Sequence, residues 1–303
     1  MMLTKLIFSW LGPFLGLMLV RILPKKRAYQ VGEWIVQALV KQHDSGLYRA
    51  VRGNQAVVRD WAYEDERLHA VVLEVLLNAA YGLVDWFHAL AFPSKLDDLP
   101  CSVEDDVVAD ANRSLEEGYG VFLVGAHLSN INMFFMLIAQ REWPIQILSY
   151  HEEQGSHLSD NIFRRKFGLN VTPISASSLR QAFRRLKSGG CVLTGVDRPD
   201  TGGEVLSFFG RPTKLPIGHA RLALRTGARM IVMAVQNAKQ RSYHVVGSSL
   251  IEADHSDDDQ LDARKLAQQV LDQLEKFIRE RPAEWMMFIP VWPEELPERR
   301  SVH

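Results

Sequence analysis

Cysteine is scarce in this chain, and its scarcity limits both the compartment and the chemistry. Only Cys101 and Cys191 occur among 303 residues, and they lie far apart. Two distant cysteines do not form a disulfide framework, and no CxxC or Cys/His spacing indicates a metal site. A reducing compartment is therefore the simpler expectation, and we expect no metal to take part in the function.

An excess of charge of one sign is also absent. The chain has 35 basic and 36 acidic residues, and its formal net charge is -1. This balance gives no general attraction to nucleic acid, so any anionic partner must meet a local basic patch. Hydrophobic residues make up 47% of the chain, which is enough for a substantial core. The length suits one large domain or two modest ones.

Uncharged apolar runs are short. Leu6–Val20 has no charged residue, but its 15 residues fall short of the roughly 20 that a membrane-spanning helix needs. No small-residue cleavage site follows the run, which argues against a signal peptide. Four basic residues come after it: Arg21, Lys25, Lys26 and Arg27. Such a flank favours the cytoplasmic side for the rest of the chain. We expect residues 1–28 to form an interfacial or re-entrant membrane anchor, with a true span and a buried core helix as alternatives.

Helical periodicity is the main signal in residues 29–100, which we expect to form a helical layer. Within it, Leu68–Phe92 is apolar on most sides, so this helix is either buried or faces lipid. Residues 101–300 instead alternate strands with helices, which predicts an α/β body with a mixed central sheet flanked by helices. The acid-rich segment 254–262 predicts a solvated loop and a helix start rather than a metal site.

The expected elements of the α/β body alternate along its length. Strands are expected at 120–125, 144–150, 170–174, 191–197, 205–209, 229–236 and 242–251. Helices are expected at 104–117, 129–141, 158–167, 177–188, 216–227 and 260–281. Ser177 is the expected N-cap of the fourth of these helices.

The segment from Val121 to Asn132 carries the clearest candidate for chemistry. A buried strand there ends just before His127, and ligands of open α/β sheets bind at the carboxyl ends of strands. An imidazole at this place can remove the proton of a hydroxyl that attacks a thioester. Such a base needs a partner on its other ring nitrogen. Asn132, one helical turn further on, is the expected partner.

The pattern Gly125-x-His127-x-x-Asn130-x-Asn132 resembles the His-x4-acid motif of the bacterial lipid A biosynthesis acyltransferases, within the wider glycerolipid acyltransferase group. Asn132 stands in place of the acid of this motif, and Ser129 in place of a frequent glycine. In the serine-protease triad, the corresponding change from acid to amide costs about 10⁴ in turnover.

Further blocks resemble the same family in the same order, over roughly residues 30 to 290. They are Arg164-Arg-Lys-Phe-Gly168, Leu186-Lys-Ser-Gly-Gly190 before a strand that ends in Asp197-Arg198, Phe208-Phe-Gly210, Leu215-Pro-Ile-Gly218, Leu222-Ala-Leu-Arg-Thr-Gly-Ala228 and Pro282-Ala-Glu-Trp285. Each block alone is a weak signal, but the ordered set is fairly specific.

The resemblance implies that residues 29–300 form an acyltransferase domain at the cytoplasmic face of the inner membrane. Its donor would be a thioester of acyl carrier protein or coenzyme A, and its acceptor a hydroxyl of a lipid A-like glycolipid or related lipid. No further cofactor is implied. His127 would be the general base, and Asn132 its weakened orienting partner. The implied substrate-binding residues are Asn130, Arg164, Asp197, Arg198 and Gly210.

Two other functions stay open because of Asn132. One is a catalytically degenerate relative that binds lipid or acyl carrier, and the other is a slow thioesterase in which water replaces the lipid acceptor. A carboxylate supplied to His127 from elsewhere in the fold would favour the transferase, and Asp197 and Asp200 are the candidates. The less specific interpretations also stay open: a structural histidine, a structural pairing of Asp197 and a solvated basic helix face around Arg164.

Overall fold

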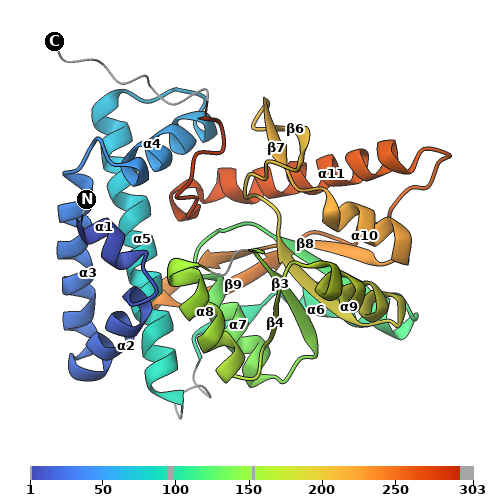
Figure 1. Cartoon of the computed structure of the whole chain (residues 1–303), viewed down its shortest axis with the longest axis horizontal. Helices are drawn as coiled ribbons and strands as arrows, with labels where there is room; N and C mark the ends of the chain where they lie inside the picture. The colour runs from blue at the N-terminus through green and yellow to red at the C-terminus, as the bar shows by residue number, and fades with distance from the viewer. Residues whose placement is uncertain (1, 94–98, 152–153, 294–303) are drawn as a thin grey trace.

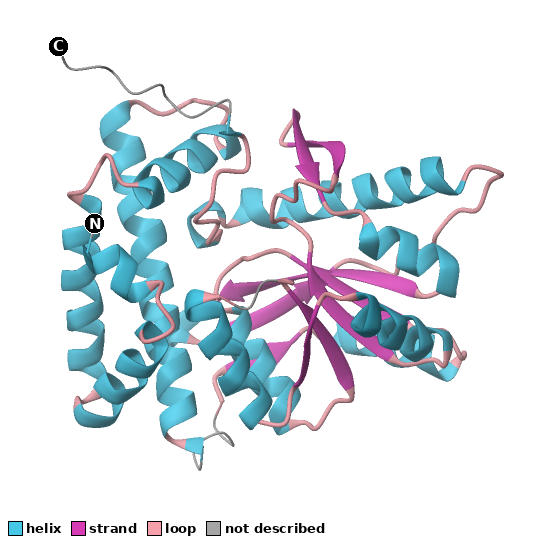
Figure 2. Ribbon diagram, in the orientation of Figure 1, coloured by secondary structure: helices cyan, strands magenta, loops and turns pink. Residues whose placement is uncertain are grey.

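A seven-stranded sheet forms the centre of the computed structural model, which describes residues 2–93, 99–151 and 154–293 (Figures 1 and 2). Its strands are β1 (Cys101–Val103), β2 (Val121–Gly125), β3 (Ile145–Ser149), β4 (Asn170–Pro173), β5 (Cys191–Gly195), β8 (Arg229–Asn237) and β9 (Tyr243–Gly247). The strand order is β1-β9-β8-β2-β5-β3-β4, with only the β8–β9 pairing antiparallel. The expected mixed α/β sheet is therefore confirmed.

Helices cover both faces of this sheet, and the central strand β2 shows why. All five of its residues are buried, as is usual for a strand with both faces covered. Phe122 and Val124 belong to the core beneath α9 (Ala176–Lys187), α10 (Gly218–Thr226) and α11 (Asp259–Glu280). The alternate residues of β2 belong to the opposite core, with α6 (Asp105–Glu116) and α7 (Ile131–Gln140).

The helical layer lies beside the sheet, at the left of Figure 1. It consists of α1 (Met2–Ile7), α2 (Gly12–Ile22), α3 (Lys25–Val40), α4 (Gly46–Val58) and α5 (Asp65–Ala91). Among the described residues, α5 is the one helix long and apolar enough to cross a membrane, but 56% of its most apolar window is buried inside the protein. That burial is typical of a core helix.

The apolar run Leu6–Val20 does not form one continuous helix, because it is divided between α1 and α2. Within α2 only Pro13 and Val20 are buried. Large apolar side chains of this region are open to solvent: Leu6, Phe8, Trp10, Leu11, Phe14, Leu15, Met18 and Ile22. The exposure of these side chains argues against the alternative of a buried core helix for this run.

Two strands were not predicted. β1 lies at the edge of the sheet and has only three residues, which are too few to show a clear alternation of apolar and polar side chains. β7 (Arg211–Leu215) pairs with β6 (Glu204–Phe208) in a separate antiparallel hairpin. Pro212 and the charged residues of β7 are not typical of a strand. A two-stranded hairpin nevertheless tolerates proline, because each of its strands has one unpaired edge.

Helix starts are partly as expected. Ser175, not Ser177, caps α9: its hydroxyl accepts from the Ser178 backbone N–H at 3.1 Å, and the Ser178 hydroxyl accepts from the Ser175 N–H at 2.8 Å. The predicted helix start in the acid-rich segment is confirmed, because the Asp258 carboxylate caps α11. The last part of the expected α/β body, 294–300, lies outside the described residues.

Candidate active site

His127 lies directly beyond the carboxyl end of β2, between the ends of β5 and β8. Gly125 pairs with Gly195 of β5, and a Cβ on Gly195 would approach the His127 ring carbon Cε1 to 3.4 Å. The imidazole thus lies in contact range of the neighbouring strand. The His127 side chain is 45% exposed, so a substrate can reach it.

Asp197 is the partner of His127. Its Oδ1 lies 2.7 Å from the imidazole Nδ1, and its Oδ2 accepts from the His127 backbone N–H at 2.9 Å. The Trp285 indole donates to the same Oδ2 at 2.8 Å. Asp197 is fully buried. A carboxylate at Nδ1 favours the tautomer that carries its proton there, which leaves Nε2 free to accept a proton from a substrate.

The interaction between His127 and Asp197 raises the pKa of the histidine and lowers the pKa of the acid. The Asp197 carboxylate raises the pKa of His127 above its usual value, against the effects of burial and of the Arg198 and Arg164 charges. Burial alone would raise the pKa of Asp197. The charge of His127 and the hydrogen bonds from His127 and Trp285 outweigh it and hold the Asp197 pKa low. Asp197 therefore stays ionised and stabilises an imidazolium at His127.

Residues near the C-terminus fix the loop that carries His127. After the short 3-10 helix Pro282–Glu284, Trp285 forms an antiparallel bridge with Leu128. The Met286 N–H donates to the His127 carbonyl at 2.7 Å. The sequence predicted the block Pro282-Ala-Glu-Trp285 only through its resemblance to the family, with no role for Trp285. No local pattern connects Trp285 with His127, because the two lie far apart along the chain and only the fold brings them together.

Asn132 does not contact His127. Its Oδ1 accepts from Nη2 of Arg164 at 2.7 Å and from Nε at 3.1 Å. The expected pairing of Asn132 with His127 is therefore corrected: Asp197 occupies Nδ1, whereas Asn132 in the first turn of α7 faces α8 (Gly155–Lys166), which carries Arg164. A carboxylate from elsewhere in the fold thus reaches His127, and it is Asp197 rather than Asp200.

Arg164 and Arg198 both act on His127 electrostatically, since each charge lowers the pKa of the imidazole. The Arg198 guanidinium stacks 3.9 Å from the centre of the Tyr150 ring. Arg164 lies against the rings of Phe135 and Trp86, at 5.1 and 5.8 Å. Neither arginine forms an ion pair within the described part of the chain. The histidine thus stands beside two cations without carboxylate partners.

Two expected substrate-binding residues lie away from the open face of this cluster. Asn130 is buried and its amide donates to the Gly82 carbonyl of α5 at 2.7 Å. Gly210 is in the turn of the β6–β7 hairpin with a φ of +70°, and open space surrounds its Cβ position. The hydrogen bond to α5 gives Asn130 a structural role, and a left-handed turn accounts for the glycine.

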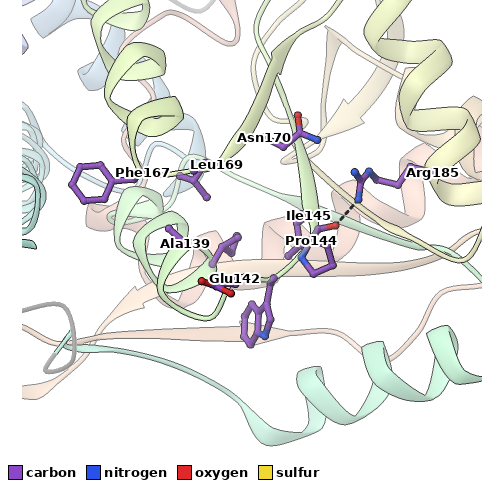
Figure 3. Close-up of a pocket in the computed structure, with 11 residues that line it drawn as sticks. Ala139, Glu142, Pro144, Ile145, Phe167, Leu169, Asn170 and Arg185 are labelled. Carbon is purple, nitrogen blue, oxygen red and sulfur yellow. Dashed lines mark hydrogen bonds between the residues drawn. The ribbon is translucent and has the colours of Figure 1, made fainter.

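A surface pocket of about 350 Å³ lies elsewhere (Figure 3). Its lining includes Ile145 and Asn170, the first residues of β3 and β4, so it opens at the amino ends of these strands. Arg185 closes one side by donating to the Pro144 carbonyl at 2.6 Å. None of the candidate site residues lines this pocket. We therefore assign it no part in the site around His127.

Comparisons with known proteins place the chain in a family. The family described as "Bacterial lipid A biosynthesis acyltransferase" matches residues 1–294. A phosphatidylinositol mannoside acyltransferase of Mycobacterium tuberculosis (strain CDC 1551 / Oshkosh) is 29% identical over 194 residues, which are 62% of this chain and 59% of that protein. Its namesake in Mycolicibacterium smegmatis is 25% identical over the same length, 61% of that protein. The match thus spans about three fifths of these relatives. By the extent of the family match, the chain belongs to the bacterial lipid A biosynthesis acyltransferase family.

Proposed function

We propose that this protein is a lipid acyltransferase, which moves a fatty acyl group from a thioester to a hydroxyl of a lipid. The observation that carries the proposal is the open His127 imidazole with a buried, ionised Asp197 on its Nδ1. Membership of the family supports the reaction class. The carboxylate also argues against a catalytically degenerate relative, because Asn132 is not the residue on which the base depends.

The chemistry needs one base and an activated donor. Nε2 of His127 takes the proton of the acceptor hydroxyl while the hydroxyl oxygen bonds to the thioester carbonyl carbon. The Asp197 carboxylate stabilises the imidazolium that forms. When the tetrahedral intermediate collapses, the carbon–sulfur bond breaks and the imidazolium returns its proton to the departing thiolate. An ester and a free thiol result, with no covalent acyl-enzyme.

Arg164 and Arg198 are the proposed contacts for anionic parts of the substrates. Guanidinium groups bind phosphate oxygens with paired hydrogen bonds. Phosphate is present in coenzyme A and in the phosphopantetheine arm of acyl carrier protein, so either donor suits the site. We propose a lipid A-like glycolipid or a related phosphorylated lipid as the acceptor. The named relatives acylate phosphatidylinositol mannoside.

We propose the cytoplasmic face of the inner membrane as the working location. The exposed apolar side chains of α1 and α2 suit insertion to the depth of lipid headgroups and upper acyl chains. The exposed basic residues after α2, Lys26 and Arg27, suit anionic headgroups. Burial of most of the apolar window of α5 argues against that helix as the membrane contact.

The test is an incubation of the purified protein with a radiolabelled acyl thioester, with and without membrane lipid extract. Label should move to lipid only when lipid is present, and the transfer should be lost in His127→Ala. Release of free fatty acid without labelled lipid would favour the thioesterase instead. Absence of both products with either donor, in a folded protein, would leave the degenerate relative as the better account.

A further inference from the structure

The Arg164 guanidinium is held in place by neutral amide oxygens. Nε and Nη2 donate to Asn132 Oδ1 at 3.1 and 2.7 Å, and Nη1 donates to Asn161 Oδ1 at 2.9 Å. Asn161 is fully buried, and its amide nitrogen donates to the Ser149 hydroxyl at 3.2 Å, which fixes the direction of its oxygen. The position of the guanidinium is thus determined by two side chains that carry no charge.

Arg164 forms no ion pair with any residue that the structure describes. A guanidinium has five N–H groups. Three donate to the two amides, and two are left without a partner among the described residues. Asp160, the acid whose charge reaches Arg164, makes no ion pair with it, and burial raises the pKa of Asp160 to about 6. Asp160 thus acts on Arg164 through its charge without occupying any of its N–H groups.

We propose that Asn132 is a positioning residue that fixes Arg164 without neutralising it, so that the guanidinium charge and its two remaining N–H groups bind a phosphate of the substrate. The inference rests on the proposed acyl transfer and deepens it. It gives position 132 a role toward the anion site rather than toward His127.

An acid at position 132 would act differently because of its charge, not its shape. Asp has nearly the same shape as Asn, so it would accept the same two N–H groups in a side-on ion pair. That pair would compensate the charge of Arg164. Its negative charge would also offset the effect by which Arg164 lowers the pKa of His127, so the pKa of His127 would rise. The amide therefore preserves both an anion site and a less basic imidazole.

The first experiment measures binding without turnover. Inorganic phosphate is titrated into the full-length protein by calorimetry, and the His127 ring is titrated by NMR with labelled histidine. Asn132→Asp should weaken phosphate binding about tenfold and raise the pKa of His127. The matched control is Asn170→Asp, the same change at the amino end of β4, which should leave both quantities unchanged.

A double-mutant cycle separates this role from a structural one. In an Arg164→Gln background, Asn132→Asp should have no further effect on phosphate binding. The thermal midpoint of Asn132→Asp should stay at or above that of the wild type, because an ion pair replaces two neutral hydrogen bonds. An unchanged phosphate affinity, an equal loss in the Arg164→Gln background, or no saturable phosphate binding by the wild type would each overturn the proposal.

Turnover then identifies which substrate brings the phosphate. Palmitoyl-CoA is compared with palmitoyl-N-acetylcysteamine, which has no phosphate, and vesicles with lysophosphatidic acid are compared with vesicles with monoacylglycerol. In Asn132→Asp, KM should rise about tenfold for the phosphate-bearing member of one pair only, with kcat changed less. A rise for both members of each pair counts against the proposal. Loss of transfer in all variants, with the binding pattern intact, would count against the acyl transfer alone.

Discussion

At the scale of single residues, the site depends on one buried carboxylate that accepts three hydrogen bonds. Asp197 accepts hydrogen bonds from the His127 ring, the His127 backbone N–H and the Trp285 indole. The two hydrogen bonds from His127 hold its imidazole and its loop in place. The hydrogen bond from Trp285 helps to stabilise the Asp197 charge, which is buried away from water. A substitution at Asp197 should therefore change both the rate and its pH dependence.

Asp197→Asn should lower turnover by about 10³ to 10⁴, because the imidazolium loses its counter-charge and the preferred tautomer is lost. The base works as neutral imidazole, so the wild-type rate should rise with pH through a His127 pKa above about 6.5. Without the carboxylate, burial and the two arginines lower this pKa, and the acid limb should move to lower pH. The measurement is kcat/KM against pH, and a limb that moves upward would contradict the assignment.

Trp285→Phe isolates the indole donor. Trp285 and Trp292 belong to one aromatic cluster with Phe208 and Phe209, but the Trp292 indole N–H is buried without a hydrogen-bond partner. Each substitution removes the pyrrole part of an indole, but only Trp285→Phe also removes a hydrogen bond to Asp197. Trp285→Phe should lower the free energy of unfolding by about 2 kcal/mol more than Trp292→Phe. Urea denaturation measures this difference, and equal losses would show that Asp197 does not need the indole.

Residue types and order were enough to place His127 just beyond the end of a buried strand and to name Asp197 as a possible source of its carboxylate. The contact itself could not be deduced, because 70 residues separate the two and the pairing of β2 with β5 brings them together. Spacing along the chain favoured Asn132, five residues away. It could not show that the first turn of α7 faces α8 rather than the end of β2.

At the scale of elements, strongly apolar or amphipathic segments were predicted within a few residues, whereas the edge strand β1 and the hairpin strand β7 were missed. β2 and β3 are continuous apolar runs because the sheet buries both of their faces. β7 alternates Arg211, Thr213 and Leu215 with solvent-facing residues, and it has a partner on one side only. A strand that is stabilised mainly by its hairpin partner therefore has a weaker apolar pattern in the sequence than a strand that is buried on both faces.

The N-terminal helices should bind membranes through side chains that the fold does not use. Trp10 and Met18 are each 55% exposed, and the contacts of this region with α8 use the Phe8 and Trp10 carbonyls, which Ser156 and Ser159 bind. Replacing Trp10 and Met18 by Ser should lower partitioning into anionic phospholipid vesicles at least about tenfold without unfolding the protein.

Co-sedimentation with vesicles measures this partitioning, and Leu261→Ser is the control. Leu261 is 46% exposed at the start of α11, far from α1 and α2 in Figure 1. Its substitution should leave vesicle binding unchanged. Equal binding by the wild type and by the Trp10/Met18 variant would rule out this surface as the membrane contact.

At the scale of the whole molecule, the helical layer and the sheet are joined by a buried polar cluster that the sequence did not reveal. Asp85 of α5 accepts from the hydroxyls of Tyr29 in α3 and Tyr243 in β9, and it lies 2.8 Å from the Lys25 ammonium. Burial raises the pKa of Tyr243, with the Asp85 charge acting in the same direction, so the phenol stays a donor. One carboxylate thus connects three elements.

Asp85→Ala should therefore weaken the attachment of the whole layer. Two phenol groups and a partly buried ammonium would lose their acceptor, and we expect a loss of about 3 kcal/mol in the free energy of unfolding. Glu33→Ala is the control, since it removes one 2.8 Å bond from the Tyr81 hydroxyl in the same layer and should cost about 1 kcal/mol. Urea denaturation followed by tryptophan fluorescence compares the two. If Asp85→Ala costs no more than the control, apolar packing alone holds the layer to the sheet.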